Sequence, residues 1–113
     1  MLAALSASAP LAFEDVLADD ATWGSPHDPT RFCRDRSEVL GWYRRGLRAG
    51  VRARVIQMQV SDDFVVIGLE ILGGAADPIE QWQVLVVEDD KITRIVGFDD
   101  GGTAMRWAEG RPA

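Results

Sequence analysis

The sequence contains very few of the side chains that hold metals or form covalent intermediates. Cys33 is the single cysteine and His27 the single histidine among 113 residues. One cysteine cannot close an intrachain disulfide, and a zinc site needs about three protein ligands. The sequence therefore predicts no metal site and no other cofactor. A nucleophilic pair of Cys33 and His27 is the alternative, but most free cysteines are packed and inert.

Positive charge and long apolar runs are also scarce. Twelve Lys and Arg residues stand against 18 Asp and Glu, which gives a net charge of −6. Nucleic acids and anionic membranes require a basic surface, so we expect neither as a partner. The longest apolar stretch, Phe64 to Leu72, contains Glu70 and is too short to span a bilayer. The first residues lack the basic segment of a secretory signal, so we expect a cytoplasmic protein.

The residues that are present are those of one ordinary globular domain. Hydrophobic residues make up 47% and charged residues 27% of the chain, a balance typical of folded proteins. The length predicts a single domain over residues 1–113. A chain of this size builds only a small core, which favours dimerisation.

Two helices are expected in the first half of the chain. Pro10 suits the first turn of a helix that places Phe13, Val16 and Leu17 on one face and ends at Asp19-Asp20. A short strand, residues 21–23, and a loop rich in turn formers, residues 24–29, follow. The second helix is the clearest: it begins with a capping pair, carries apolar residues at helical spacing and ends at a glycine. These positions are Asp35 and Glu38, then Val39, Trp42, Tyr43 and Leu47, and finally Gly50.

The second half of the chain has the period of β-strands. Four runs rich in β-formers are separated by short turn signals, which predicts an antiparallel meander. The runs are Arg52–Ser61, Phe64–Leu72, Glu80–Glu88 and Lys91–Phe98, and a short helix is expected from Thr103 to Glu109. The second run is apolar on both of its faces. Helices on one side would leave the other side wet, so we expect a second subunit on the open face.

The order of these segments resembles a known family. The sequence Leu17-Ala-Asp-Asp-Ala-Thr-Trp23, a proline-containing loop and the strand-turn-strand Val84-Leu-Val-Val-Glu-Asp-Asp-Lys-Ile-Thr-Arg-Ile95, followed by Phe98-Asp99, are similar to the SnoaL-like branch of the nuclear transport factor 2-like superfamily. The likeness covers residues 10–105. It implies a cystatin-like α+β cone, in which N-terminal helices, the first shortened here, pack on one face of a curved antiparallel sheet. It also implies a pocket at the wide end, and dimers are common in the family.

Family members include isomerases, polyketide cyclases, dehydratases and epoxide hydrolases, but this sequence departs from their catalytic patterns. Ser25 stands where the strand of ketosteroid isomerase carries its general base, and a serine without a neighbouring base cannot shuttle a proton near neutral pH. No tyrosine precedes Tyr43, where the family's oxyanion tyrosine would lie. An epoxide hydrolase arrangement could draw on Arg94 and Asp99, but strand parity places these on opposite faces unless a bulge intervenes.

The pocket implied by the resemblance has aromatic walls and scattered polar groups. Alternation along the first strand places Trp23 and Ser25 on one face, and the clear helix adds two more aromatic residues. The expected lining residues are Trp23, Ser25, Trp42, Tyr43, Glu70 and Trp82. Glu70 either pairs with an arginine or is a pocket acid with a raised pKa. Four glutamines form a polar set that lines either the pocket or an exposed or dimeric face: Gln57, Gln59, Gln81 and Gln83.

Two residues are the candidates for proton transfer. His27 follows the first strand at the expected pocket mouth, and its ordinary pKa lies near neutrality. Asp99 follows the last strand, where partial burial would raise its pKa. The alternative is that His27 is an exposed loop residue and that Asp99 caps the last helix.

The sequence leaves two functions open and does not decide whether the protein is an enzyme. The first is a pocket protein that acts on a small, largely apolar or amphipathic molecule as an isomerase, cyclase or hydrolase. The second is a non-catalytic homodimeric module for ligand binding or protein interaction. An enzyme needs at least two polar groups that converge at pocket depth, whereas a binding protein needs only shape and one anchor.

Overall fold

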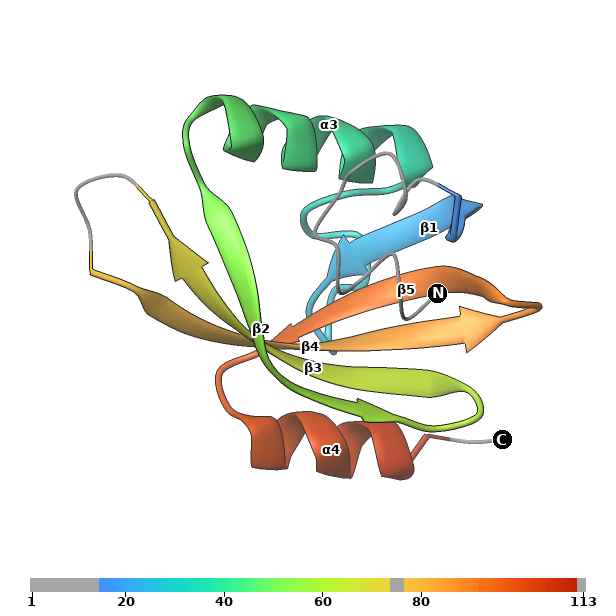
Figure 1. The fold of residues 1–113 in the computed structure, drawn as a ribbon. Coiled ribbons are helices and arrows are strands. Elements are labelled where there is room, and N and C mark those ends of the chain that lie inside the picture. Colours follow the sequence, from blue (N-terminus) through green and yellow to red (C-terminus); the bar gives the residue numbers. More distant parts are fainter. Residues whose placement is uncertain (1–14, 74–76, 112–113) are drawn as a thin grey trace.

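A computed structural model of the protein describes residues 15–73 and 77–111. This part of the chain forms a five-stranded sheet with a helix on each side (Figure 1). The elements, in chain order, are β1 (Leu17–Gly24), α3 (Arg36–Arg48), β2 (Arg52–Val60), β3 (Phe64–Leu72), β4 (Ile79–Glu88), β5 (Lys91–Phe98) and α4 (Gly101–Glu109). The predicted α+β class is confirmed. No helix in the described ranges is long and apolar enough to cross a membrane.

The sheet combines the predicted meander with one parallel strand. Its order is β1-β5-β4-β3-β2, and β2 to β5 pair antiparallel as predicted. At the far edge β1 pairs in parallel with β5, with Trp23 opposite Ile95. The sheet is therefore mixed rather than wholly antiparallel. Parallel neighbours need a long crossover connection, and here α3 and the first three strands of the meander supply it.

The turns of the meander explain why its strand limits were predictable. Asp89 and Asp90, between β4 and β5, have φ angles of 51° and 63°. Aspartate tolerates this left-handed region, and two such residues in succession match the twist of a tight hairpin. The strands β3 and β5 have the predicted limits, while β2 ends one residue early and β4 begins one residue early. The expected turn from Gly73 to Pro78 falls partly outside the described residues.

The helix α3 is fixed at both ends by its own sequence. The carboxylate of Asp35, the N-cap, accepts a hydrogen bond from the backbone N–H of Glu38 at 3.0 Å. The carboxylate of Glu38 accepts one from the backbone N–H of Arg34 at 2.7 Å, one residue before the cap. At the other end Gly50 has a φ of 85°, the left-handed conformation that ends helices. The predicted caps therefore lie where the sequence placed them.

The prediction of a helix that ends at Asp19-Asp20 is wrong for the last residues of that helix. Leu17 to Asp20 belong to β1, where Leu17 pairs with Ile92 of β5 and Ala21 is fully buried. Pairing with a strand far along the chain outweighs a weak local preference for helix. Pro10 and Phe13, the other residues used for this helix, lie outside the described residues.

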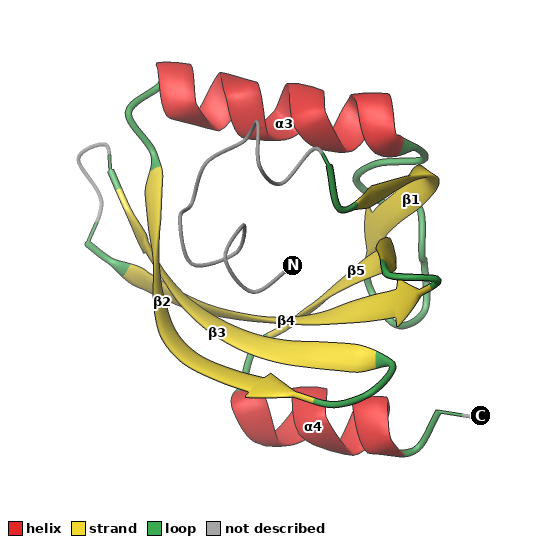
Figure 2. Cartoon of the chain, turned by 45° about the vertical axis from the view of Figure 1, so that its right-hand side comes forward, coloured by secondary structure: helices red, strands yellow, loops and turns green. Residues whose placement is uncertain are grey.

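Each face of the sheet carries its own hydrophobic core. The core beneath α3 and β1 includes Val39, Ile67 and Ile95, whereas the core beneath α4 includes Val66 and Ala104. The two helices lie on opposite sides of the curved sheet (Figures 1 and 2). The expected packing of the N-terminal helices on one face thus holds for α3, and the C-terminal helix α4 packs on the other face. It is α4, within the same chain, that covers much of the second apolar face of β3.

Candidate functional site

An aromatic cluster lies on the α3 side of the sheet, and Trp23 of β1 is its centre. The rings of Trp23 and Tyr43 are stacked with centroids 5.4 Å apart. Trp42 and Phe32 meet Trp23 edge-on at 6.0 Å and 6.4 Å. The structure therefore brings together three residues predicted to line one pocket, namely Trp23, Trp42 and Tyr43, and adds Phe32, which the sequence analysis missed. A fold-back of the loop after β1 places Phe32, and no local pattern signals it.

That fold-back is a short antiparallel bridge between Trp23 and Cys33. The backbone N–H of Trp23 donates to the carbonyl of Cys33 at 2.9 Å, and the N–H of Cys33 donates to the carbonyl of Trp23 at 3.0 Å. Cys33 is buried in the core, and burial, with Glu38 nearby, raises the pKa of its thiol. Burial also raises the pKa of Tyr43, with a smaller effect from Cys33. Both groups are therefore neutral near pH 7.

The outer side of the aromatic cluster carries cations. Phe32 and Trp42 are about half exposed, and the guanidinium groups of Arg31 and Arg45 lie over their rings at 5.7 Å and 5.9 Å. Each arginine already satisfies the negative face of its ring. A cationic ligand would meet like charges here, so the cluster disfavours a cation.

One polar side chain is buried on this same face of the sheet. Gln83 of β4 is 4% exposed and is the only buried polar residue in the described part of the chain. Gln83 lies two residues before Leu85 on β4, so the two side chains are on the same face of the sheet. Its register partners are Ile67 of β3 and Gly97 of β5. Its amide is both a donor and an acceptor of hydrogen bonds. Strand parity with Leu85 is the sequence signal that places Gln83 on this face, and Gln81 has the same parity but is exposed near the start of the strand.

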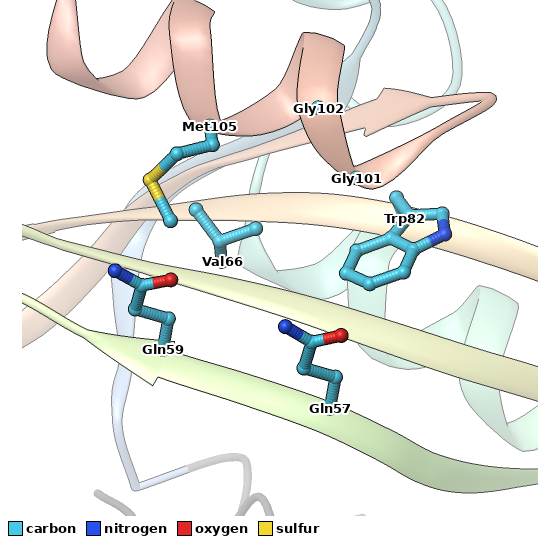
Figure 3. Close-up of a pocket in the computed structure, with 7 residues that line it drawn as sticks. All are labelled: Gln57, Gln59, Val66, Trp82, Gly101, Gly102 and Met105. Atoms are coloured by element: carbon cyan, nitrogen blue, oxygen red, sulfur yellow. The ribbon is translucent and has the colours of Figure 1, made fainter.

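A second site lies on the opposite face, between β2 and the start of α4 (Figure 3). This pocket has a volume of about 420 Å³, within the usual range for small-molecule sites. Its lining residues come from β2, β3, β4 and α4: Gln57, Gln59, Val66, Trp82, Gly101, Gly102 and Met105. Trp82, a predicted lining residue, thus borders a pocket, but on the face opposite Trp23. Gln57 and Gln59 also lie here, apart from Gln83.

The indole of Trp82 is held between two glycines. A Cβ added at Gly68 would lie 2.8 Å from the indole, and one added at Gly101 would lie 2.9 Å from it. The indole N–H donates to the carboxylate of Glu80 at 2.7 Å. The wall that Trp82 gives to the pocket is therefore rigid.

Glu70 and Arg94 lie on the α4 side as well. Glu70 forms an ion pair with Arg54 at 2.8 Å across the β2–β3 ladder. Pairing with an arginine was one of the two alternatives predicted for Glu70. Arg94 lies over the ring of Trp107 in α4 at 5.3 Å. The structure does not bring either residue to the aromatic cluster.

The remaining candidates are placed in turns at the ends of strands. The hydroxyl of Ser25 accepts a hydrogen bond from the N–H of Asp28 at 3.0 Å, which closes the turn that holds the exposed His27. Asp99 is exposed after β5, and its neighbour Asp100 caps α4 by accepting from the N–H of Thr103 at 2.8 Å. No hydrogen bond or ion pair in the described residues joins His27 to Asp99, and their role in proton transfer stays a prediction.

The geometry offers no ready-made metal site in the ranges that the structure describes. No three His, Cys, Asp or Glu side chains converge there. The arrangement is instead a hydrophobic and aromatic face with one buried amide, and the pocket that includes Gln57 and Gln59 lies on the opposite face. Such a face can hold an apolar molecule and orient it through one hydrogen bond.

Comparison with known proteins gives a family and several structural neighbours. Residues 1–95 match the SnoaL-like domain family, whereas no curated protein matches the sequence significantly. A cystatin fold protein from Novosphingobium aromaticivorans is similar with a TM-score of 0.71 and 15% identity, covering 85% of this chain and 89% of that one. A candidate polyketide cyclase from Sinorhizobium meliloti gives 0.66 and 18%, covering 85% and 87%.

A third neighbour, from Catenulispora acidiphila, has a ketosteroid isomerase-like fold and was solved in complex with trimethylamine. It is similar with a TM-score of 0.65 and 19% identity, covering 98% of this chain and 96% of that one. At these identities the neighbours establish a shared fold and not a shared reaction. The predicted resemblance is confirmed by the family match and by the cystatin-like fold. With 95 of its 113 residues matched, the chain belongs to the SnoaL-like domain family.

Proposed function

We propose that the protein binds a small, largely apolar molecule on the α3 side of its sheet, with Gln83 as the polar anchor. The observation that carries this proposal is the burial of the Gln83 side chain on the face that carries the α3-side hydrophobic core. Small-molecule sites combine apolar walls with a few polar groups that fix orientation. Buried amides also need hydrogen-bond partners, and a ligand carbonyl or hydroxyl suits this one.

The surroundings of Gln83 narrow the ligand class. The stacked rings of Trp23 and Tyr43 favour a flat or cyclic apolar body. The arginines over Phe32 and Trp42 disfavour a cation, as described above. A neutral, ring-containing ketone, alcohol or amide fits both conditions.

The described residues favour a protein that binds its ligand without acid–base catalysis. The titratable side chains that pack within the core on this side are those of Cys33 and Tyr43, and both have raised pKa values. A general base must be largely deprotonated near the operating pH, and neither group meets that condition. His27 and Asp99 are exposed in turns. We therefore propose a binding protein rather than an isomerase, cyclase or hydrolase.

The test is a titration of the protein with paired ligands, in which tryptophan fluorescence reports binding. One member of each pair is a cyclic aromatic ketone, and the other is the hydrocarbon of the same shape. Gln83→Leu should weaken ketone binding about tenfold, the value of one good hydrogen bond, and leave the hydrocarbon unaffected. Gln81→Leu is the matched control, because Gln81 lies on the same strand and face but is exposed.

Two results would contradict the proposal. Equal effects of Gln83→Leu and Gln81→Leu on ketone binding would remove Gln83 as the anchor. Protein-dependent conversion of an unsaturated ketone, followed by ultraviolet absorbance, would instead favour an enzyme. In that case His27→Ala and Asp99→Asn become the next variants to measure.

A second candidate function is self-association through the free edge of the sheet at β2. β2 is an edge strand, and its Ile56 and Val60 are 44% and 51% exposed. Large apolar side chains on an unpaired strand edge are typical of interaction surfaces. We propose a homodimer that covers this edge, and its test is given in the Discussion.

A further inference from the structure

Two arginines lie against a single indole on the α4 side of the sheet. The guanidinium carbon of Arg94, from β5, lies 5.3 Å from the ring centroid of Trp107, and that of Arg111, just after α4, lies 5.9 Å from it. The indole attracts each cation. The two cations nevertheless repel one another, and the repulsion is stronger where water is partly excluded.

Three polar atoms in this region are buried without a hydrogen-bond partner. They are Nε of Arg94, Nη1 of Arg111 and Oγ1 of Thr22. Thr22 is the register partner of Arg94 in the β1–β5 ladder, so their side chains leave the sheet on the same face. An unmade hydrogen bond at a buried donor is costly. Three hydrogen-bond donors in one region therefore point to a missing acceptor.

The protein does not supply that acceptor within the described residues. The described ion pairs lie elsewhere and join Arg34 to Glu38, Arg36 to Asp19, and Arg54 to Glu70. Arg94 and Arg111 have contacts with Trp107 but no carboxylate partner in these ranges. Acidic residues are abundant, since 18 of them outnumber the 12 basic ones. The lack of a counter-charge at this place is therefore a local feature.

Arg94 and Arg111 are both partly exposed, so solvent reaches this region. Of their guanidinium nitrogens, Nε of Arg94 and Nη1 of Arg111 are the ones buried without a partner. The helix α4 packs mainly on β3, β4 and β5, which leaves the edge at β1 without a helix on this face, whereas α3 packs on β1 from the other face (Figure 1). A ligand can approach from that edge.

We propose that Arg94, Arg111 and Thr22 form a binding site for a carboxylate group, with Trp107 as its aromatic wall. A planar carboxylate matches the fork of a guanidinium and accepts several charge-assisted hydrogen bonds. The hydroxyl of Thr22 is a further donor. The site lies on the face opposite Gln83, and it stands independently of the function proposed above. A ring attached to the carboxylate would lie beside the indole, so aromatic acids should bind better than acetate.

The experiment follows the arginine Nε–H signals by ¹⁵N NMR while benzoate is added at constant ionic strength. We expect the signals of Arg94 and Arg111 to shift and saturate, more readily with benzoate than with acetate. Methyl benzoate has the same ring without the charge and should not shift them. Inorganic phosphate at the same ionic strength tests whether the site takes any oxyanion.

Substitutions then assign the site. Arg94→Gln and Arg111→Gln should each weaken benzoate binding at least tenfold. The matched control is Arg31→Gln, because Arg31 also lies over an aromatic ring but has no second arginine on that ring. Thr22→Val keeps the shape of the side chain, removes one donor and should weaken binding severalfold, which keeps the proposal testable if an arginine variant fails to fold.

Three outcomes would overturn the carboxylate site. The first is a shift that rises linearly with benzoate and does not saturate. The second is an equal loss of binding in Arg31→Gln. The third is competition by phosphate as strong as that by benzoate, which would indicate general attraction of anions and not recognition of a carboxylate.

Discussion

Replacing Gly68 with alanine tests how Trp82 is held between β3 and α4. The new Cβ would lie 2.8 Å from Cη2, 2.9 Å from Cζ3 and 3.0 Å from Cζ2 of the indole. The indole cannot move away freely, because Gly101 approaches its other side and its N–H is bonded to Glu80. Such overpacking costs about 1–3 kcal/mol, whereas alanine regains about 0.5–1 kcal/mol of backbone entropy. We expect a net loss of about 1–2 kcal/mol.

The assay is urea unfolding followed by circular dichroism, with a matched helix control. At a slope of about 1–3 kcal/mol per molar urea, the expected loss is easily measured as a lower midpoint. Gly41→Ala in α3 is the control, since its new Cβ would meet only the end of Arg45 at 3.6 Å. That variant should gain up to about 1 kcal/mol from helix propensity.

A double-mutant cycle identifies the indole as the cause. In Trp82→Phe the outer part of the indole is gone, so Gly68→Ala should cost much less than in the parent protein. An unchanged cost in this background would refute the reasoning, and so would a Gly68→Ala protein as stable as the parent.

Three further predictions concern acid stability, thiol reactivity and assembly. Hydrogen bonds from Thr103 lower the pKa of Asp100, so the cap stabilises the fold fully above the ordinary pKa of aspartate and is lost as pH falls through the lowered value. The urea midpoint of Asp100→Ala should therefore fall less between pH 7 and pH 3 than that of the parent, and an equal fall would contradict the role. Burial raises the pKa of Cys33, so a disulfide reagent at pH 8 should label it slowly in the native protein and rapidly in urea; rapid native labelling would oppose this. For the proposed homodimer, light scattering should give about twice 12.4 kDa, and Ile56→Lys or Val60→Lys should shift it towards the monomer, whereas a monomeric parent would exclude it.

The parts of the fold that were predictable are those fixed by neighbouring residues. The cap at Asp35 and the left-handed Gly50 define α3 within a few residues, and Asp89 and Asp90 define the hairpin between β4 and β5. The parallel pairing of β1 depends instead on β5, which lies about 75 residues further along the chain. Nothing local in Leu17 to Asp20 reports that partner, and the same residues were compatible with a helix.

The second apolar face of β3 illustrates a different limit. Alternation correctly indicated that both faces are apolar, but it could not identify what covers them. The helix α4 buries only small side chains completely, Ala104 and Ala108, beside the partly buried Met105 and Trp107. Two alanines are a weak hydrophobic signal, so a second subunit was the simpler expectation.

The candidate site also has a part that could be predicted from the sequence and a part that could not. Trp23, Trp42 and Tyr43 could be grouped from strand and helix periodicity, because each lies on a face that its own element defines. The separation of Gln83 from Gln57 depends on the register and bulges of the sheet. The arginines around Trp107 meet only because α4 returns across β5, a contact that no sequence spacing reveals.

The pairing of β1 with β5 has a consequence for how the chain folds. The first strand cannot enter the sheet until the last strand exists, so this edge closes over a loop of most of the chain. Closing such a loop is entropically costly, and contacts of this range slow folding. During synthesis, Trp23 and the first turn of α3 emerge well before Ile95 does. The aromatic cluster is therefore expected to be among the last parts to order, after the meander has formed, and its rings remain open to non-native contacts until then.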